Sequence, residues 1–357
     1  MRFGRRHWKS KLHLLLICFV LYVCYTNVKW INVARDLTDR GVNVWDIRNL
    51  TVNGDLGLTE LQIQTLTVKT PVPKKCFQLT WNRDLLNQPL DKTCAFITIA
   101  SKEGRLGNHM FRVASLIGMA YTLDLVPILP NLPVVSKWFE LPNMAKLILQ
   151  NSSTVVAPDC CRYLNTSTEL DPKYNWTVHG YLQSWKYFFK ARSEISEAFR
   201  FRADSLLTVK KYTDNLRINV STLVGVHVRR RDMASLSSGR KGYIAPGADY
   251  ISKAMQHFRD LKLGVIQFII ISDDMTWCKV NVVGENITYS PFKNSGFDMA
   301  LMTSCDHVII TSGSYGWWGG WLAGGRVVYF SGFPKPDSAL MKETDIHDYY
   351  PPEWLGL

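Results

Sequence analysis

The segment TLVGVHVRRRD, residues 222–232, decides the fold class of this chain. Its first seven residues, Thr222–Val228, are an apolar, β-branched run of strand length, which is typical of a strand buried on both faces. Three arginines and an aspartate follow the run almost directly. Because ligands in open α/β sheets bind beyond the carboxyl ends of the strands, we expect a binding site at this point.

Strand and helix patterns alternate on both sides of that segment. Short apolar runs predict strands at 94–100, 265–271, 307–311 and 326–330, and helical patterns lie at 110–123, 298–305 and 315–323. Such alternation predicts an α/β fold with parallel sheets. The two groups of elements, at 94–180 and 222–330, flank a mostly helical stretch. We therefore expect two doubly wound, Rossmann-like halves with a cleft between them.

The N-terminus has the pattern of a transmembrane signal anchor. Residues 12–28, LHLLLICFVLYVCYTNV, form a 17-residue apolar run, at the short end of the roughly 17–25 residues that span a bilayer. The preceding tail, 1–11, carries five basic residues and no acid, which places the N-terminus in the cytosol. No small-residue cleavage site follows, so an anchor is favoured over a cleaved signal peptide. We expect a stem at 29–92, an N-terminal half at 93–218 and a C-terminal half at 219–357.

Two features beyond the apolar run agree with a body on the lumenal side of a secretory membrane. Glycosylation sequons occur at six positions: Asn49, Asn151, Asn165, Asn175, Asn219 and Asn286. Six cysteines also lie there, and an even count in an oxidising compartment suggests disulfides: Cys76, Cys94, Cys160, Cys161, Cys278 and Cys305. Six cysteines allow 15 pairings, all of them open at this point. Together these features predict a single-pass type II protein of the Golgi membrane.

The composition excludes several classes of protein. A hydrophobic fraction of 46% excludes a disordered chain. The tail supplies five charges of the formal net charge of +12, so the rest of the chain carries +7. This modest basic excess fits a small anionic substrate. No zinc-finger, RNA-recognition or basic-helix pattern accompanies it, so no nucleic-acid partner is expected.

Two motifs at strand ends offer charged side chains. The arginines at 229–231 suggest a clamp for phosphate, because guanidinium groups bind phosphate bidentately; an exposed basic turn is the alternative. Asp273 and Asp274 could bind a metal, hydrogen-bond a ribose or base, or cap the next helix. No D-x-D occurs anywhere in the chain, which argues against an acidic metal–nucleotide site.

A third motif, CDHVIITSGSYGWWGGWL at 305–322, places small residues between a strand and a helix. Such a turn can direct backbone N–H groups at a phosphate, so Ser312 or Ser314 is a candidate for phosphate contact. Trp317 and Trp318 are interpreted as packing residues rather than as a stacking platform.

A fourth motif is the turn GRLGNHMF at 104–111. It does not fit the G-x-G-x-x-G fingerprint of dinucleotide-binding sites. Its simplest interpretation is a tight connection from a strand to a helix, with Asn108 as the helix cap. On its own, His109 is interpreted as a structural residue rather than a catalytic one.

Together these motifs resemble the α1,2-fucosyltransferases and their wider GDP-fucose-using relatives, over roughly residues 94–330. The turn G-R-L-G-N-x-M-F and the segments S-D-D-x-x-W-C, S-x-S-x-x-W-W and G-Y-x-Q-S-x-K-Y-F match that family. His109 stands where the family usually has Gln. We expect this difference to affect the choice of acceptor and to leave the use of the donor intact. The family pattern H-x-R-R-x-D is matched by His227, Arg229, Arg230 and Asp232.

The resemblance implies a GT-B fold, with the acceptor bound by the first half and GDP-fucose by the second. It implies inverting transfer of L-fucose to the 2-hydroxyl of a terminal galactose on glycans. No cofactor and no obligatory metal are expected, and a homodimer is allowed for. Two alternatives stay open: a GDP-fucose-dependent protein O-fucosyltransferase or other fucosyl linkage, and a catalytically inactive lumenal sugar-binding protein.

The resemblance also implies roles for single side chains. Arg230 would hold the β-phosphate with Arg229 in support, and Ser314 would contact the pyrophosphate. For the nucleoside, the resemblance implies that His227 and Asp298 contact guanine and that Asp274 contacts the ribose or the edge of the base. A carboxylate or imidazole within hydrogen-bond reach should take the proton of the acceptor hydroxyl, and the candidates are Asp232 first and His109 second.

Overall fold

The structure is a computed structural model that describes residues 74–80, 93–100, 104–142, 152–158 and 160–357. These residues belong to one compact unit that begins at Lys74. The predicted anchor, 12–28, lies outside the described residues, as does most of the predicted stem. Within the part that is described, no helix has the length and apolar character to cross a bilayer.

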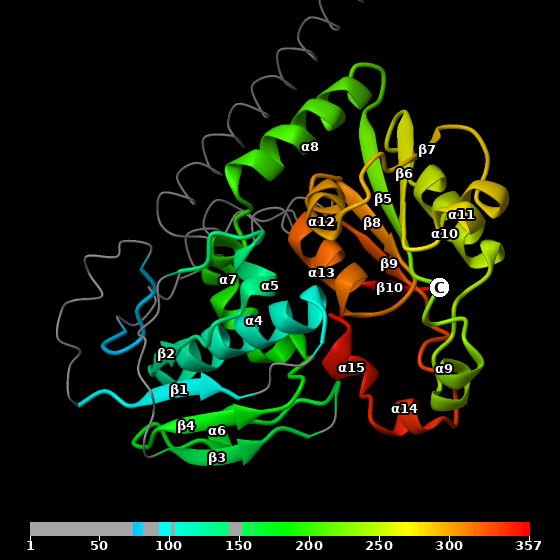
Figure 1. Ribbon diagram of the computed structural model, residues 1–357. Coiled ribbons are helices and arrows are strands. Elements are labelled where there is room, and N and C mark those ends of the chain that lie inside the picture. Colours follow the sequence, from blue (N-terminus) through cyan, green and yellow to red (C-terminus); the bar gives the residue numbers. More distant parts are fainter. Residues whose placement is uncertain (1–73, 81–92, 101–103, 143–151, 159) are drawn as a thin grey trace, which may run out of the picture. The chain divides into compact units, whose positions relative to one another are not determined.

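The first half of the unit is built on a sheet of four parallel strands. They are β1 (Phe96–Ile99), β2 (Val126–Ile128), β3 (Ser153–Val156) and β4 (Trp176–His179), in the order β2-β1-β4-β3. Helix α4 (Leu106–Leu123) connects β1 to β2 and packs on the sheet (Figure 1). Short helices α5 (Pro133–Ser136) and α6 (Thr166–Glu169) follow β2 and β3. All strands run the same way, so their carboxyl ends share one edge.

A mostly helical stretch connects this sheet to the next one, as the sequence predicts. Its elements are η2 (Trp185–Tyr187), η3 (Phe189–Ala191), α7 (Arg192–Ala198) and α8 (Ala203–Leu216). Helix α4 contacts η2, η3 and α7, and α8 contacts α12 of the second half, so this stretch is part of the packed fold.

The second half contains a six-stranded parallel sheet in the order β10-β9-β8-β5-β6-β7. The strands are β5 (Thr222–Val228), β6 (Ile266–Ser272), β7 (Ile287–Tyr289), β8 (His307–Ile310), β9 (Val327–Tyr329) and β10 (Leu355–Gly356). Numbered from β5, this is the order 3-2-1-4-5-6 of dinucleotide-binding folds, which reverses direction between β5 and β8. The predicted α/β class with parallel sheets is confirmed.

Helices cover both faces of the six-stranded sheet (Figure 1). On one face lie α12 (Ser295–Thr303) and α13 (Ser314–Ala323), and on the other α10 (Ala248–Asp260) and α11 (Met275–Asn281). Because both faces are covered, all seven residues of β5 are buried, which explains its mostly apolar sequence. The small helices α9 (Leu236–Lys241), α14 (Ala339–Lys342) and α15 (Ile346–Tyr349) lie in the connections.

One hydrophobic core extends across both sheets. Phe111 of α4 lies with its ring centroid 4.5 Å from that of Trp317 and 5.2 Å from that of Trp318 on α13. Both tryptophans are fully buried, which confirms their interpretation as packing residues. The aromatic contact fixes the start of α4 against the start of α13, an arrangement on which the site depends.

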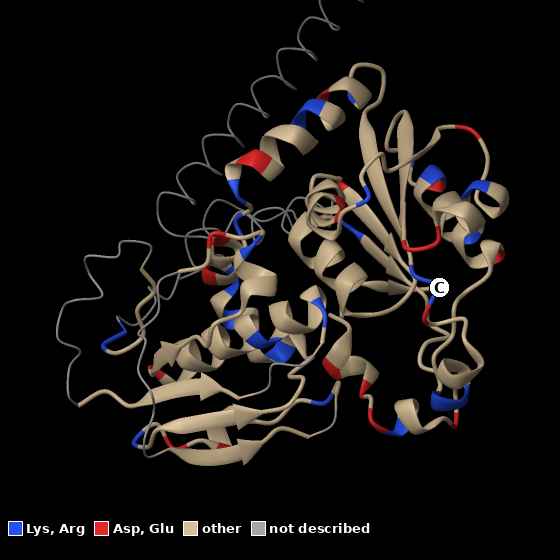
Figure 2. Ribbon diagram, viewed as in Figure 1, with Lys and Arg blue, Asp and Glu red and all other residues tan. Residues whose placement is uncertain are grey.

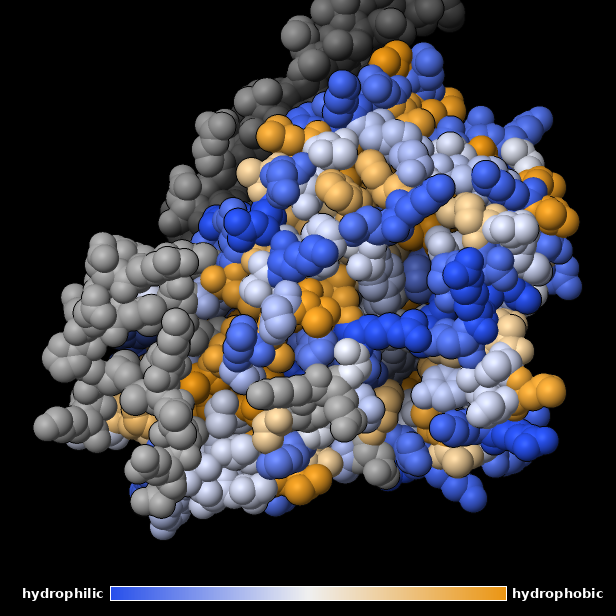
Figure 3. Space-filling view, viewed as in Figure 1, coloured by the Kyte–Doolittle hydropathy of each residue, from blue (hydrophilic) through white to orange (hydrophobic). Residues whose placement is uncertain are grey.

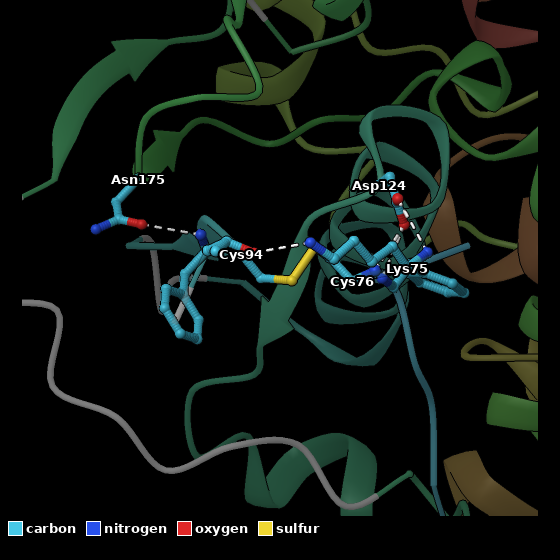
Figure 4. Close-up of a disulfide and its surroundings, with 8 residues drawn as sticks. Lys75, Cys76, Cys94, Asp124 and Asn175 are labelled. Carbon is cyan, nitrogen blue, oxygen red and sulfur yellow. Dashed lines mark hydrogen bonds between the residues drawn. A yellow bond between two sulfur atoms is a disulfide. The ribbon is translucent and has the colours of Figure 1, made fainter. Parts of the chain in front are cut away.

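A disulfide joins Cys76 to Cys94 just before β1 (Figure 4). Beside it, the carboxylate of Asp124 accepts the backbone N–H groups of Lys75, Cys76 and Phe77 at 3.0 Å each. Burial opposes ionisation of Asp124, but these hydrogen bonds prevail and lower its pKa. The predicted stem therefore overlaps the folded domain at its C-terminal end. Of the predicted disulfides, the described residues contain this one, and four cysteines are free: Cys160, Cys161, Cys278 and Cys305.

Candidate functional site

The carboxyl ends of β5 and β8 meet at the point where the strand order reverses, and the predicted motifs lie there. The backbone N–H of Arg229 donates to Oγ1 of Thr311 at 3.0 Å, which ties the two strand ends together. Gly313 follows with a φ of +85° and directly precedes α13. A Cβ at that position would collide with Nη1 of Arg229, so only glycine lets the guanidinium lie against the start of the helix.

The guanidinium of Arg229 is held by a two-point ion pair. Its Nε and Nη2 donate to the two carboxylate oxygens of Asp232 at 3.0 and 2.6 Å. From the other half, Nη2 of Arg105 lies 3.4 Å from the same carboxylate. The hydrogen bond from Arg229 lowers the pKa of Asp232, although burial opposes this. Asp232 therefore orients Arg229, and a carboxylate so engaged is a weak proton acceptor; its predicted role as base gains no support from the geometry.

Arg230 faces a different way. Its backbone N–H donates to Oδ1 of Asp273 at 2.8 Å, and its guanidinium lies 3.8 Å from the ring centroid of Trp277 on α11. Its Nη1 donates to the carbonyl of Pro246 at 3.1 Å. The sequence interpretation gave Arg230 the main phosphate contact with Arg229 in support. The geometry favours the reverse, because Arg229 is the arginine that lies against the start of α13.

Asp274 is the N-cap of α11. Its Oδ1 accepts the backbone N–H of Trp277 at 3.2 Å, which is the simplest of the interpretations that the Asp-Asp pair allowed. Acidic and basic positions thus gather where β5 and β6 end (Figure 2). Among the described residues, no three His, Cys, Asp or Glu side chains form a cluster that could hold a metal ion.

Three side chains gather at the start of α13: His227 is buried, and Tyr315 and Asp298 are half-buried. His227 is 5% exposed, and burial, together with the charge of Arg229, lowers its pKa to about 3, so the imidazole is neutral. Its ring centroid lies 5.3 Å from that of Tyr315. The hydroxyl of Tyr315 donates to the carbonyl of Ser295 at 2.5 Å, in the first turn of α12, which also carries Asp298. Burial, followed by the charge of Asp298, raises the pKa of Tyr315.

Asp298 lies in the first turn of α12 but does not cap it. The cap is Asn294, whose Oδ1 accepts the N–H of Gly296 at 2.9 Å. Asp298 instead accepts the hydroxyl of Ser290 at 2.5 Å. Burial raises its pKa to about 6 in spite of that hydrogen bond. The carboxylate of Asp298 therefore has no capping role in α12.

The start of α4 meets the start of α13. Oγ of Ser314 donates to Oδ1 of Asn108 at 2.6 Å, and Nε2 of Gln183 donates to the same oxygen at 3.3 Å. A Cβ at Gly107 would lie 2.6 Å from the backbone of Ser314, so this contact also requires a glycine. Asn108 does not cap α4, whose N-cap is Arg105; that interpretation is wrong, and the side chain joins the two halves instead.

Several buried polar atoms around the strand ends have no hydrogen-bond partner within the described part of the chain. They include Nδ1 of His227, Nε of Arg230 and Oγ of Ser312. Unsatisfied buried polar atoms are rare and need a reason, and a ligand with polar groups is one such reason. Hydrophilic side chains also gather on the displayed face over the region of α9, α10 and α11 (Figure 3).

His109, the second candidate for the base, is buried on α4. It is 4% exposed, and burial, followed by the charge of Arg112, lowers its pKa. No hydrogen bond or ion pair within the described part of the chain joins it to Arg229 or Asp232. A neutral, enclosed imidazole at this place agrees with the structural interpretation.

The sequence comparisons with known proteins point to one family. The sequence profile of glycosyl transferase family 11 matches residues 52–357. Galactoside α-(1,2)-fucosyltransferase 2 of Mus musculus is 29% identical in an alignment of length 278 that covers 71% of this chain and 76% of the mouse protein. Galactoside α-(1,2)-fucosyltransferase 1 of Aotus azarae is 28% identical in an alignment of length 339 that covers 86% of this chain and 88% of that protein. Among solved structures, Arabidopsis thaliana FUT1 in complex with GDP has 14% identity and a TM-score of 0.48, covering 69% of this chain and 72% of that one.

Proposed function

This chain belongs to glycosyl transferase family 11, and we propose that it is an inverting enzyme that transfers L-fucose from GDP-fucose to the 2-hydroxyl of a terminal galactose on glycans. The names of the mouse and monkey relatives support the acceptor and the linkage. The observation that carries the proposal is the fixed guanidinium of Arg229 at the start of α13. In this proposal the two sheets are the halves of a GT-B enzyme, with the donor bound on the six-stranded side.

The arrangement suits the charge that develops during transfer. As the bond between C1 of fucose and the phosphate oxygen breaks, the leaving GDP gains negative charge. Arg229 is held in place by Asp232, and the first turn of α13 offers N–H groups and the positive end of a helix dipole. Donors fixed before the reaction stabilise the transition state without reorganising, so they lower its barrier. Ser314 lies at the same helix start and can contact the pyrophosphate.

The group of His227, Tyr315 and Asp298 is the proposed guanine site. A carboxylate can accept two hydrogen bonds from the N1–H and N2–H₂ edge of guanine, an edge that adenine and uracil do not offer. Within this group, Nδ1 of His227 has no hydrogen-bond partner among the described residues. The carboxylate of Asp274 already accepts a hydrogen bond as the cap of α11. Its contact with the ribose therefore stays a prediction.

The proton acceptor stays a prediction as well. Asp232 is bound to Arg229, and His109 is enclosed on α4. The proposed reaction tolerates a weak base, since a fucosyl group with cationic, oxocarbenium-like character needs little help from the attacking hydroxyl.

Incubation of the purified chain with GDP-fucose and a panel of galactosides tests the proposal. We expect a fucosylated product whose linkage, read by NMR, is to O2 of galactose. Transfer to folded protein domains in preference to galactosides would instead identify a protein O-fucosyltransferase. GDP binding without any transfer would identify a sugar-binding protein that has lost turnover.

The cationic site predicts that activity does not need a divalent metal. Arg229 can stabilise the leaving diphosphate, and the chain contains no D-x-D. Activity assayed in excess EDTA should fall by no more than a few fold. Complete loss on chelation, followed by recovery with Mn²⁺, would assign a metal-binding role to Asp273 or Asp274 and would contradict this prediction.

We further propose that the protein is a type II protein of the Golgi membrane, anchored by residues 12–28, with a lumenal catalytic domain. The basic tail before the apolar run and the six sequons beyond it support this location. Asn165, Asn219 and Asn286 are exposed and can accept a glycan. Protease added to sealed vesicles should spare the C-terminal domain, and glycosidase should reduce its apparent mass. A domain that is digested and carries no glycan would overturn the orientation.

The homodimer stays a prediction, which the mass of the solubilised protein can test.

A further inference from the structure

The segment 180–184 turns sharply after the carboxyl end of β4. Leu182 has a φ of +57°, a left-handed conformation that is unfavourable for a residue other than glycine. Its side chain is buried, and its carbonyl accepts the hydroxyl of Ser115 at 3.0 Å, so packing holds the strained turn in place. Strain of this kind persists where the surroundings impose it, and it gathers at functional sites.

The turn presents the ring of Tyr181, which is 39% exposed. The guanidinium of Arg112 lies 5.2 Å from the ring centroid, and Nε of Arg112 donates to the carbonyl of Gly180 at 3.2 Å. Arg112 itself is only 1% exposed. A buried cation thus supports one side of a partly exposed ring, so the ring is positioned before any ligand arrives.

Tyr181 belongs to the edge that meets the proposed donor site. The two halves make contact where Arg105 lies 3.4 Å from Asp232 and where Ser314 donates to Asn108. Gln183, two residues after Tyr181, donates to Oδ1 of Asn108 at 3.3 Å, and this is the oxygen that accepts the hydroxyl of Ser314. The turn that carries Tyr181 therefore reaches the contact between the two halves.

We propose that Tyr181 binds the acceptor sugar by stacking its ring against the apolar C–H face of the galactoside, and that it sets the affinity for the acceptor. The inference rests on the proposed function and names a residue for its acceptor side. Aromatic side chains supply most of the contact in small-molecule sites, while a few polar groups fix orientation. A sugar that stacks on Tyr181 through its C–H face leaves its hydroxyl groups available to face the site of Arg229.

Steady-state kinetics with lactose as acceptor tests this role. Tyr181→Ala should raise the KM for lactose about five- to tenfold, the size of a lost aromatic contact, while the KM for GDP-fucose and the Kd for GDP keep their wild-type values. Tyr181→Phe retains the ring and should keep the KM for lactose within about twofold. Tyr181→Leu, apolar but not aromatic, replaces the alanine variant if that one fails to fold.

Tyr174 provides the matched control. It is a tyrosine with 58% exposure that precedes the amino end of β4, at the opposite edge of the same sheet. Tyr174→Ala should leave the KM for lactose unchanged. An unchanged KM in Tyr181→Ala, an equal rise in Tyr174→Ala, or a rise in the KM for GDP-fucose would overturn the inference. A wild-type chain that binds GDP but transfers to no galactoside would be recognised before any variant is compared, and it would overturn the proposed function and the inference together.

Discussion

Replacing Arg229 with alanine is expected to lower kcat for fucose transfer by a factor of about 10²–10³, the loss typical of removing one fixed donor to a developing charge. Arg229 is the guanidinium that lies against the start of α13, with both oxygens of Asp232 holding it. The effect should fall mainly on kcat, because the contact strengthens as the leaving group gains charge. Turnover of GDP-fucose with a galactoside acceptor, measured on protein with an unchanged melting temperature, provides the check.

Neighbouring arginines supply the controls for this experiment. Arg231 is exposed, so Arg231→Ala should be mild. Arg229→Lys keeps the charge but loses the two-point geometry with Asp232, so it should recover only part of the rate. Arg230→Ala separates the two assignments. If it costs more than Arg229→Ala, the main phosphate contact belongs to Arg230, as the sequence interpretation had it.

The fold class could be predicted because its longest elements leave strong local patterns. Strand β5 is a seven-residue apolar run, and α4 is a long run of buried positions. Five strands of two to four residues were missed, because segments this short show no clear periodicity: β2, β3, β4, β7 and β10. Their place in the sheet is set by their neighbours and not by their own composition.

The candidate site could be predicted only as a set of motifs. The order of strands places His227, Arg229 and Ser314 together, and that follows from the general rule for parallel sheets. The pairs Arg105–Asp232 and Ser314–Asn108 join residues more than one hundred positions apart, and no local pattern reports such contacts. The cap of α12 was missed as well: the helical pattern was placed at 298–305, whereas the helix begins at Ser295, directly after its cap Asn294.

The ionisation of Asp298 gives the site a dependence on pH. Burial raises its pKa from 3.8 to about 6. Between these two pH values the carboxyl group is therefore protonated in the folded protein and ionised in the unfolded chain. An acid whose pKa is raised by folding contributes stability that is complete below about pH 4 and is lost as the pH rises through about 6. This pKa shift corresponds to a contribution to the free energy of unfolding of at most about 3 kcal/mol. At neutral pH the unliganded protein therefore contains an ionised carboxylate that is largely removed from water.

Asp298→Asn should consequently stabilise the unliganded protein and weaken its binding of GDP. The amide removes the buried charge, so the melting temperature above pH 7 should rise. The amide keeps one acceptor oxygen but presents an N–H donor to the second donor of guanine, which is left unpaired, so the affinity for GDP should fall about tenfold or more. Calorimetric titration of GDP and thermal unfolding of both proteins measure the two effects, whose opposite signs a merely structural role would not produce.

The pH dependence of GDP binding then tests the ionised form directly. Guanine needs the carboxylate as an acceptor, so wild-type affinity should increase as the pH rises from 5 to 7, through the pKa of about 6. The phosphates of GDP titrate over the same range, but they do so equally with both proteins. The difference between wild type and Asp298→Asn therefore isolates this one carboxylate. Equal GDP affinities and equal melting temperatures in the two proteins would remove Asp298 from the guanine site and leave Asp273, Asp274 or His227 to bind the base.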